Sequence, residues 1–462
     1  MAKKKETPAS PFVPVEEQPY PIPENWCWTY IGNCYEVTSS RRVHKADWKE
    51  SGIPFYRTRE LVKLSENGYV DNELFISDEL YERLVAKYGK PKMGDILISG
   101  VGTIGVPYIV KSDTSFYFKD GNIIWFQCKG VCLPEYIFYL YKSDFMDNLI
   151  HDMSAGTTVD TYTIINANRT MFPLPPLAEQ NRIVSRIESL FAKLDEAKEK
   201  AQAVVDGFEL RKSVILHKAF TGELTERWRK EHGVGLDSWK HSPWGNFIAS
   251  IEAGKNWSAE GRPPQNGEFG VVKVSAVTWG EFNELESKTC TLDEQWNKKT
   301  QIRTGDFLFS RANTLQLVGN CVIVKNISRR LMLSDKILRF AFDKSVMPEY
   351  VLYFTNSDLY REQIEQLASG NQDGMRNVSQ KNMKLIEFPI PLLSEQEEIV
   401  RILENLFTKE QRSKEAAEAV LSQIDTMKKA ILARAFRGEL GTNDPAEEWA
   451  GELVKRHYKE IL

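Results

Sequence analysis

The chain lacks the sequence features of a metalloprotein, a disulfide-rich protein or a membrane protein. Its six cysteines include no CxxC pair, and its six histidines form no cluster at zinc-binding spacing. No apolar run approaches the ~18 residues that a membrane span requires. The first residues are basic but lack the apolar core of a signal peptide. We therefore expect a cytoplasmic protein with free buried thiols and no membrane partner.

Complete active-site motifs are also missing. There is no Asn/Asp-Pro-Pro-Tyr/Phe motif of an adenine-N6 methyltransferase and no GxxxxGK[ST] nucleotide loop. Gly100–Gly105 matches GxGxxG, but a strand-like stretch with Pro107 follows it, which favours a tight turn between strands over a dinucleotide site. Glu286 and Lys288 could form part of a nuclease site, yet no partner aspartate accompanies them. We expect no catalytic residue, no metal site and no cofactor in this chain.

An excess of positive charge is absent as well. The net charge is −4 and the isoelectric point is about 6.0, whereas a nucleic-acid-binding domain is usually basic. Any contact with DNA must therefore depend on local clusters. A length of 462 residues with 42% hydrophobic residues is sufficient for two or three globular domains.

The most informative feature that is present is a duplication. Residues 172–224 and 388–440 align without a gap at a spacing of 216 residues, and about half of the 53 aligned positions are identical. Each copy holds a proline-rich turn, Glu-Gln, a long apolar-periodic stretch and Ala-Phe-x-Gly-Glu-Leu. Repeats of solenoid proteins are much shorter, at roughly 20–50 residues. The spacing therefore predicts a duplicated two-part module and a pseudo-two-fold protein.

Each copy predicts a long helix with a 4-3-4-3 apolar seam, and this spacing is typical of a left-handed coiled coil. Some 33 residues would give a rod of about 50 Å. The seam of the first copy is Ile183, Ile187, Leu190, Leu194, Ala197, Ala201, Val204, Phe208, Arg211 and Ile215. That of the second is Ile399, Leu403, Leu406, Glu410, Ser413, Ala417, Val420, Ile424, Met427 and Ile431. The eight positions expected to carry the pairing are Ile183, Ile187, Leu190, Leu194, Ile399, Leu403, Leu406 and Ile424.

The segments before the two helices are related to each other more distantly. Gly94-Asp95 with the apolar run after it recurs at Gly305-Asp306, and Pro134-Glu-Tyr136 recurs at Pro348-Glu-Tyr350. Gly-Asp precedes a predicted buried strand, and Pro-Glu-Tyr begins a helix with proline in its first turn. Further strands are predicted at residues 106–110, 123–127, 319–324 and 337–342. Each segment is therefore a mixed α and β domain of roughly 150 residues.

This layout resembles the specificity subunit of a Type I restriction–modification system. The resemblance lies in Pro173-Leu-Pro-Pro-Leu-Ala-Glu-Gln180 and Ala219-Phe-Thr-Gly-Glu-Leu224, both with second copies. Domain openings at residues 52–61 and 270–280, and the segment Phe309–Asn313, match the family too. The resemblance covers nearly the whole chain after residue 20. A complete duplicated set in the right order is a specific signal, whereas one motif alone would be weak.

The resemblance implies a non-catalytic protein that reads double-stranded DNA. Each mixed domain would recognise one half of a bipartite asymmetric site, and the two helices would pair antiparallel and fix the unread gap. Two modification subunits and two restriction subunits would dock on it. S-adenosylmethionine, ATP and Mg²⁺ would then be bound only by those partners. The alternative is a helical scaffold that joins other proteins without reading DNA.

The expected fold class is α+β, with two tandem target-recognition domains and two long helices that pair as an antiparallel coiled coil. The expected boundaries are 1–20 for a flexible N-terminal arm, 21–172 and 225–388 for the recognition domains, 173–224 and 389–440 for the helical spacers, and 441–462 for a tail with a short helix.

Arginine, lysine, asparagine and glutamine are the side chains that pair with base edges or phosphates. The candidates in the first domain are Arg41, Arg42, Lys45, Arg57 and Arg59. Those in the second domain are Lys255, Arg262, Gln265, Lys273, Arg311 and Asn313. Lys288, Lys298 and Lys299 are candidates for phosphate contacts only. For each of these residues taken alone, a solvated surface role is the competing interpretation.

Overall fold

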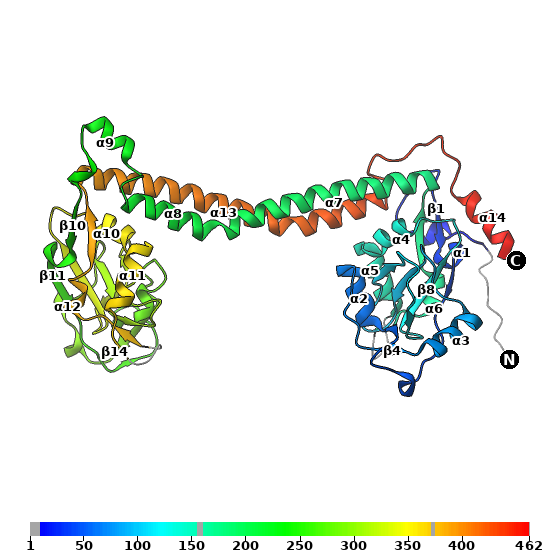
Figure 1. The fold of residues 1–462 in the computed structure, drawn as a ribbon, viewed down its shortest axis with the longest axis horizontal. Coiled ribbons are helices and arrows are strands. Elements are labelled where there is room, and N and C mark those ends of the chain that lie inside the picture. Colours follow the sequence, from blue (N-terminus) through cyan, green and yellow to red (C-terminus); the bar gives the residue numbers. More distant parts are fainter. Residues whose placement is uncertain (1–9, 155–159, 371–374, 462) are drawn as a thin grey trace. The chain divides into compact units, whose positions relative to one another are not determined.

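The computed structural model describes residues 10–154, 160–370 and 375–461, and the chain divides into two compact units. Unit 1 combines Met1–Ala201 with Ala419–Leu462, and unit 2 is the intervening Gln202–Glu418. The boundaries cross two long helices, α7 (Leu177–Asp206) and α13 (Leu393–Ala435), so each unit holds part of both. In Figure 1 the blue and cyan elements with α14 belong to unit 1, and the green to yellow elements belong to unit 2.

Unit 1 is built on an antiparallel four-stranded sheet with the order β2-β8-β5-β6. A second sheet, β4-β3-β7, pairs β3 with β7 in parallel, and a ribbon pairs β1 with β9. The strands are β1 (Cys27–Tyr30), β2 (Tyr35–Thr38), β3 (Ile53–Tyr56), β4 (Phe75–Ile76), β5 (Ile96–Ser99), β6 (Pro107–Ile109), β7 (Tyr117–Phe118), β8 (Ile123–Cys128) and β9 (Met171–Leu174).

Unit 2 repeats this topology. Its antiparallel sheet has the order β11-β19-β15-β17, its second sheet β12-β14-β13-β18 contains the parallel pair β13–β18, and its ribbon is β10–β21. A short pair, β16–β20, is added. The strands are β10 (Lys240–Pro243), β11 (Ile248–Ala253), β12 (Ala259–Glu260), β13 (Phe269–Val272), β14 (Ser287–Cys290), β15 (Phe307–Ser310), β16 (Ala312–Asn313), β17 (Cys321–Ile323), β18 (Arg330–Met332), β19 (Ile337–Phe342), β20 (Arg376–Asn377) and β21 (Glu387–Ile390).

Some of the helices stand at equivalent points of the two units. Unit 1 has α1 (Ile31–Cys34), α2 (Thr58–Asn67), α3 (Asp78–Tyr88), α4 (Pro134–Tyr141), α5 (Asp144–Ser154), α6 (Ile164–Arg169) and α14 (Gly451–Ile461). Unit 2 has α8 (Phe208–Phe220), α9 (Glu226–His232), the 3₁₀ turn η5 (Val274–Val277), α10 (Pro348–Phe354), α11 (Asp358–Leu367) and α12 (Gln380–Met383). The expected mixed α and β composition is confirmed, as are the helices that begin at Pro134 and Pro348 and the strands near residues 107, 123, 321 and 337.

The Gly-Asp motif sets the start of a central strand in each unit. Gly94 and Gly305 both have φ of +91°, a conformation that a side chain would strain. Asp95 accepts hydrogen bonds from the backbone N–H of Lys92 (2.9 Å) and the indole N–H of Trp125 (2.8 Å). Asp306 accepts the equivalent backbone bond from Arg303 and a guanidinium bond from Arg339, both at 2.8 Å. A carboxylate, buried at Asp95 and half-buried at Asp306, therefore joins the turn to the neighbouring strand, with a different donor in each copy.

Each unit also contains its own stretch of helix pairing. In unit 1, Lys428 of α13 forms an ion pair with Asp195 of α7 and lies 5.1 Å from the ring centroid of Phe191. In unit 2, Arg211 of α8 binds Glu410 of α13 at 2.7 Å. In unit 2 the ammonium of Lys414 lies 4.7 Å from the ring centroid of Phe208, while Arg211, later in α8, binds the earlier Glu410, so α8 and α13 run in opposite directions there. Figure 1 shows α7 and α8 beside α13.

Gly207 lies between the end of α7 and the start of α8, and the helical hydrogen bonds continue across it. Its N–H donates to the carbonyl of Ala203, and its carbonyl accepts from the N–H of Arg211, both at 3.0 Å. Its φ of −79° is right-handed, so the helical path continues as the sequence indicates. Arg211 and Glu410, the polar positions of the predicted seam, form an ion pair with each other.

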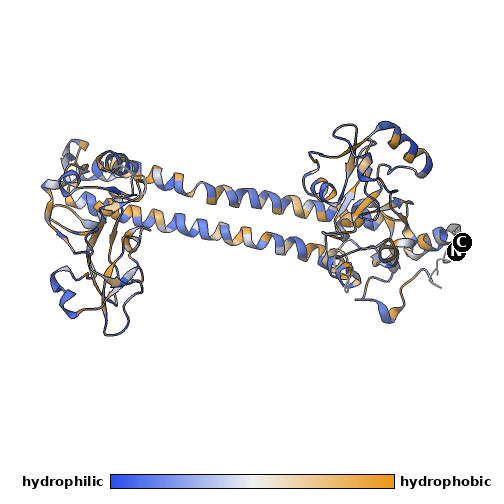
Figure 2. Ribbon diagram, turned by 90° about the horizontal axis from the view of Figure 1, so that it is seen from below, coloured by the Kyte–Doolittle hydropathy of each residue, from blue (hydrophilic) through white to orange (hydrophobic). Residues whose placement is uncertain are grey.

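The predicted seam of the second copy is wrong at three positions. Ser413, Val420 and Met427 are exposed, the last two by 43% and 45%. Lys414 and Leu421, one residue further along, are half-buried instead. The buried and half-buried positions take two four-residue steps in succession, from Leu406 to Glu410 and from Glu410 to Lys414, and such an insertion shifts the phase of a 4-3 pattern once. Figure 2 shows hydrophilic and hydrophobic residues interleaved along both helical segments.

The eight positions expected to carry the helix pairing are buried or half-buried, and four of them belong to the hydrophobic cores of the mixed domains. The structure buries Ile183, Ile187, Ile399, Leu403 and Ile424, and half-buries Leu190, Leu194 and Leu406.

Part of the segment expected to be a flexible arm is packed onto unit 1. Val13 is buried, and its N–H donates to the carbonyl of Trp28 at 3.0 Å. The ring of Phe12 lies 5.1 Å from that of Trp449 in the C-terminal tail. Apolar side chains between the prolines supply this contact, so the prediction of flexibility is wrong for residues 10–20. Residues 1–9 lie outside the described residues.

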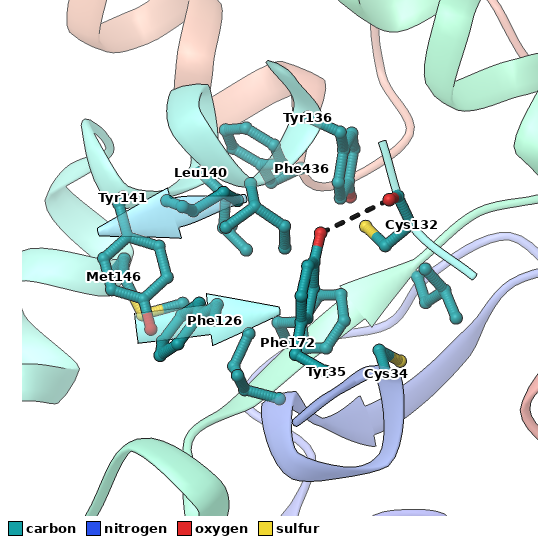
Figure 3. Packing of buried hydrophobic residues seen from close by; sticks show 14 of the residues in the cluster. Cys34, Tyr35, Phe126, Cys132, Tyr136, Leu140, Tyr141, Met146, Phe172 and Phe436 are labelled. Carbon is teal, nitrogen blue, oxygen red and sulfur yellow. Dashed lines mark hydrogen bonds between the residues drawn. The ribbon is translucent and has the colours of Figure 1, made fainter. Parts of the chain in front are cut away.

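The hydrophobic core of unit 1 packs the four-stranded sheet against α7 and the end of α13. Phe126 from β8 and Phe172 from β9 pack beside Tyr35 and Tyr136, and Phe436 from the end of α13 completes the cluster (Figure 3). The Tyr35 hydroxyl donates to the carbonyl of Cys132 at 3.3 Å. All six cysteines are free thiols, and five of them are buried. Within the described residues, no helix is long and apolar enough to span a membrane.

Candidate nucleic-acid interface

The Glu-Gln motif fastens the long helix of unit 1 to its mixed domain. Gln180 accepts a hydrogen bond from the N–H of Leu133 (2.8 Å), which precedes α4, and donates to the carbonyl of Pro175 (3.0 Å). The buried Glu179 carboxylate accepts from the indole N–H of Trp26 at 2.8 Å. The Tyr136 hydroxyl donates to the carbonyl of Pro173 at 2.7 Å.

Unit 2 repeats each of these bonds at the duplicated position. Gln396 accepts from the N–H of Met347 at 2.9 Å, Glu395 accepts from the indole of Trp239 at 2.9 Å, and the Tyr350 hydroxyl donates to Pro389 at 2.9 Å. Buried hydrogen bonds to a charged group are stronger than neutral ones and fix geometry. The motif residues are therefore structural, because they set the angle between each helix and the domain that it carries.

The two copies differ in how the buried glutamate is balanced. Arg229 of α9 donates to Glu395 at 2.7 Å, and both side chains are almost fully buried. Among the described residues Glu179 has no such ion-pair partner: Arg182 is bound by Glu447 at 2.8 Å, and besides Trp26 the Glu179 carboxylate accepts a hydrogen bond from the Thr442 hydroxyl at 3.3 Å. Burial raises the pKa of the Glu179 carboxyl, and the hydrogen bonds from Trp26 and Thr442 only partly oppose this effect.

In the first mixed domain, two of the predicted DNA-contacting arginines are held by one buried carboxylate. Arg57 binds Glu60 through two hydrogen bonds of 2.8 and 3.1 Å, and Arg59 binds the same carboxylate at 3.0 Å. Arg59 also reaches Glu73 at 2.6 Å. Burial alone would raise the pKa of Glu60, but the bonds from both arginines outweigh it and lower that pKa to about 2. The arginines are thereby ordered at the end of β3.

The remaining candidates of this domain are more exposed. The guanidinium of Arg41 lies 4.9 Å from the ring centroid of Tyr88, and Arg42 lies 3.5 Å from Asp120. Lys45 is exposed in a 3₁₀ turn. These three side chains are exposed to solvent, and the exposed contacts of Arg41 and Arg42 hold them only weakly.

In the second mixed domain, Lys273 takes the place of Arg57. It follows β13 and precedes η5, just as Arg57 follows β3 and precedes α2, and its ammonium lies 3.7 Å from Glu286. Arg262 is bound by Glu268 through two bonds of 2.7 Å and by Glu260 at 3.0 Å. Hydrogen bonds from Arg262 lower the pKa of Glu268 to about 2. The guanidinium of Arg262 is therefore engaged by carboxylates of the protein itself.

Arg311 directly precedes β16, and Asn313 is the second residue of that strand. The Arg311 side chain donates to Asn377 of β20 at 3.3 Å and stays half-exposed. The Asn313 amide donates to the Thr278 hydroxyl at 3.3 Å, while its oxygen accepts the N–H of Thr314 at 2.9 Å. Asn313 is thus engaged within the protein. Lys255 lies 5.7 Å from the ring centroid of Trp257, and Gln265 is exposed in a turn.

The sequence prediction missed the carboxylates that organise these cations. Glu60 stands three residues after Arg57 at a helix start, a capping-box spacing that could have revealed it. Glu268 and Glu286 are distant enough in sequence from their partners that no local pattern marks them. The exposed aromatic residues Tyr69 and Trp279 were also missed.

The sequence features that suggested catalysis have structural explanations. Gly100–Gly105 connects the antiparallel strands β5 and β6, and positive φ at Gly102 (+81°) and Gly105 (+79°) makes the turn, as the sequence interpretation favours. Glu286 accepts a bond from Ser275 at 2.6 Å and faces Lys273. In the part of the chain that the structure describes, no three His, Cys, Asp or Glu side chains gather in a way that could hold a metal ion.

Two α/β units with the same sheet order, each fastened to a long helix and each with cations ordered at the end of a strand, define a duplicated α/β protein. A family model described as the Type I restriction modification DNA specificity domain matches residues 23–205 and 246–420. The chain belongs to this family of specificity subunits, the DNA-recognition components of Type I restriction–modification systems.

Individual relatives agree with this membership. The chain is 28% identical over 333 residues to the Type I restriction enzyme EcoKI specificity subunit of Escherichia coli. The aligned region covers 69% of this chain and 69% of that subunit. The chain is 27% identical to the StySPI specificity subunit of Salmonella potsdam, over 68% of this chain and 67% of that one. Among solved structures, the HsdS subunit from Thermoanaerobacter tengcongensis has the same fold, with a TM-score of 0.65 at 19% identity, over 92% of this chain and all of that one.

Proposed function

We propose that each mixed domain reads one half of a bipartite asymmetric DNA site, and that the chain itself is not catalytic. The repeated sheet order of the two units is the observation that supports this proposal most directly. Two domains of the same topology with different loops and different cations would read two different short sequences. Arg57 and Lys273, at the same point of the two topologies, are the side chains that we expect nearest to the DNA.

We further propose that the helices of both units form one antiparallel coiled coil around a pseudo-two-fold axis. The ion pairs Lys428–Asp195 in unit 1 and Arg211–Glu410 in unit 2 support this arrangement, since both join α13 to the chain of the first helical copy. The domain boundaries predicted from the sequence stay part of this proposal. A rod of about 50 Å would separate the half-sites by more than one duplex turn of about 34–36 Å.

Partner subunits would bring the chemistry. We expect two modification subunits with S-adenosylmethionine and two restriction subunits with ATP and Mg²⁺, acting with this chain in the cytoplasm. Apolar side chains left exposed on the helices offer a docking surface: Leu210 and Val214 in unit 2, and Val420 and Met427 in unit 1. Exposed apolar patches are typical of protein contacts.

A methylation map of genomic DNA tests the proposal. Cells that express this chain with its modification subunit should carry N6-methyladenine in a new motif with two fixed halves and a fixed unread gap. Cells that express the modification subunit alone are the control and should lack the motif. If a stable complex forms and no motif depends on this chain, the DNA-reading proposal fails and the chain is a scaffold for other proteins.

A further inference from the structure

The most exposed aromatic side chain of each unit lies at the same point of the repeated topology. Trp279 is 75% exposed and Tyr69 is 74% exposed, and no other aromatic side chain that the structure describes is as exposed. Tyr69 lies in the connection from α2 to β4, and Trp279 in the connection from η5 to β14. These connections are equivalent, because α2 and η5 each follow the strand that forms the parallel pair of its unit.

Hydrogen bonds hold the Trp279 loop in its outward position. The carbonyl of Thr278 accepts from the Asn320 amide at 2.8 Å, and the Thr278 hydroxyl accepts from Asn313 at 3.3 Å. Asn320 is in turn held by Arg361 at 3.4 Å. Gly280, directly after Trp279, has φ of +84° and completes the turn. The indole therefore stays in water although the residue before it is buried.

The Tyr69 loop is fixed in a comparable way. Gly68 ends α2 with φ of +76°, and its N–H donates to Leu64 at 3.0 Å. Further along, Glu73 is held by Arg59, which belongs to the first turn of the same helix. This ion pair folds the loop back toward Arg57 and Arg59, so Tyr69 belongs to the segment that the candidate cations organise.

A rigid, exposed aromatic ring has a recognisable use. Burying an indole gains about 25 cal/mol for each square ångström of apolar surface removed from water, so a partner that covers the ring of Trp279 would gain binding energy without having to order the loop. Trp279 borders an open hollow of about 780 Å³ that Glu281 and Glu284 also line. These carboxylates would repel a phosphate, so the ring face suits a base or a deoxyribose.

We propose that Tyr69 and Trp279 are equivalent aromatic contacts, each packing against the base step or deoxyribose of one half of the DNA site. The assignment depends on the proposed function, because it needs each unit to face its own half-site. It also gives Asn313 a new role: its amide positions the Trp279 loop instead of reading a base.

Binding of duplex DNA to the complex of this chain with its modification subunit tests the assignment. Three duplexes are needed: one with the full motif from the methylation map, and two in which one half is scrambled. Trp279→Ala and Tyr69→Ala should each weaken binding of the full duplex about tenfold, equal to about 1.4 kcal/mol. Each effect should vanish on the duplex whose matching half is scrambled, and Trp279→Phe and Tyr69→Phe should retain most of the affinity.

Matched controls separate the ring contact from general surface changes. Val15→Ala in unit 1 and Leu292→Ala in unit 2 also remove exposed apolar side chains, at 80% and 52% exposure, and should leave the affinity unchanged. Tryptophan fluorescence should be quenched by the full duplex in the parent complex and less so in Trp279→Phe.

The outcomes are distinguishable. Unchanged affinity of both alanine variants, with motif-specific binding by the parent complex, overturns this inference and leaves the proposed function intact. Loss of the modification subunit from the variant complexes, with DNA binding otherwise normal, also overturns it and assigns the rings to a protein contact. Absence of motif-specific binding by the parent complex overturns the proposed function itself.

Discussion

Replacing the buried glutamate of each Glu-Gln motif by glutamine should have different effects in the two units. In unit 2, Glu395→Gln leaves the Arg229 guanidinium buried without its anion, while its bond to the carbonyl of Gly222 remains. Removing one partner of a buried ion pair costs about 3–5 kcal/mol, so a loss of about 3 kcal/mol is expected. In unit 1, Glu179→Gln removes no cation–anion pair and should change stability by less than about 1 kcal/mol.

The pH dependence should separate the two positions further. Since the pKa of Glu179 is raised in the folded protein, its carboxyl favours folding most at low pH, where it is protonated in both states. That contribution is lost as pH rises from the ordinary carboxyl pKa through the raised one. Over this interval unit 1 should lose stability relative to the Glu179→Gln variant, whose amide does not titrate.

Native-state hydrogen exchange read by mass spectrometry can follow the two units separately in the intact chain. Peptides from α4 report on unit 1 and peptides from α10 report on unit 2. Faster exchange in α10 for Glu395→Gln, with little change in α4 for Glu179→Gln, is the expected result. Equal acceleration in both units would refute the argument that Arg229 makes the difference.

Three further predictions concern DNA reading and the helices. Arg311→Ala should weaken one half-site only, by ~1–3 kcal/mol if the guanidinium contacts a guanine, as measured with duplexes scrambled in one half; equal loss at both halves would indicate a folding or phosphate effect. Replacing Leu190 and Leu406 together by aspartate should abolish motif methylation in cells, and persistent methylation at an unchanged motif would contradict the paired-helix proposal. Tyr350→Phe should lower the stability of unit 2 by about 1 kcal/mol through the lost bond to Pro389, measured by hydrogen exchange in α10, with Tyr353→Phe as the control.

The duplication, the helix starts and the central strands were accessible from the sequence because they depend on local patterns. A proline in a first turn, a Gly-Asp turn and an apolar period each act over a few residues, and the elements beginning at Pro134, Pro348, Ile96 and Phe307 follow them. The Gly100–Gly105 turn was predictable for the same reason. The family signatures were readable too, since they stand twice in one chain.

Burial and contacts that depend on the folded arrangement could not be predicted from local sequence patterns. The seam prediction fails at Ser413, Val420 and Met427 because the buried face of α13 shifts by one residue after Glu410, and apolar residues at both Val420 and Leu421 leave the sequence pattern unable to show that shift. The packing of Val13 onto unit 1 depends on a neighbouring strand whose position no local pattern records. For the same reason, the sequence does not reveal that the side chains of Arg262 and Asn313 are engaged within the protein.

The sequence by itself determined that the protein is a duplicated pair of α/β modules with long helices, and that its motifs are those of a DNA-specificity subunit. Only the tertiary structure decided what the motif residues do. It shows that Glu395 is balanced by Arg229 whereas Glu179 is not, and that Trp279 is held in water. Hydrogen bonds and ion pairs between residues distant in sequence exist only once the chain is folded, and they determine which charged and aromatic groups remain free to meet a ligand.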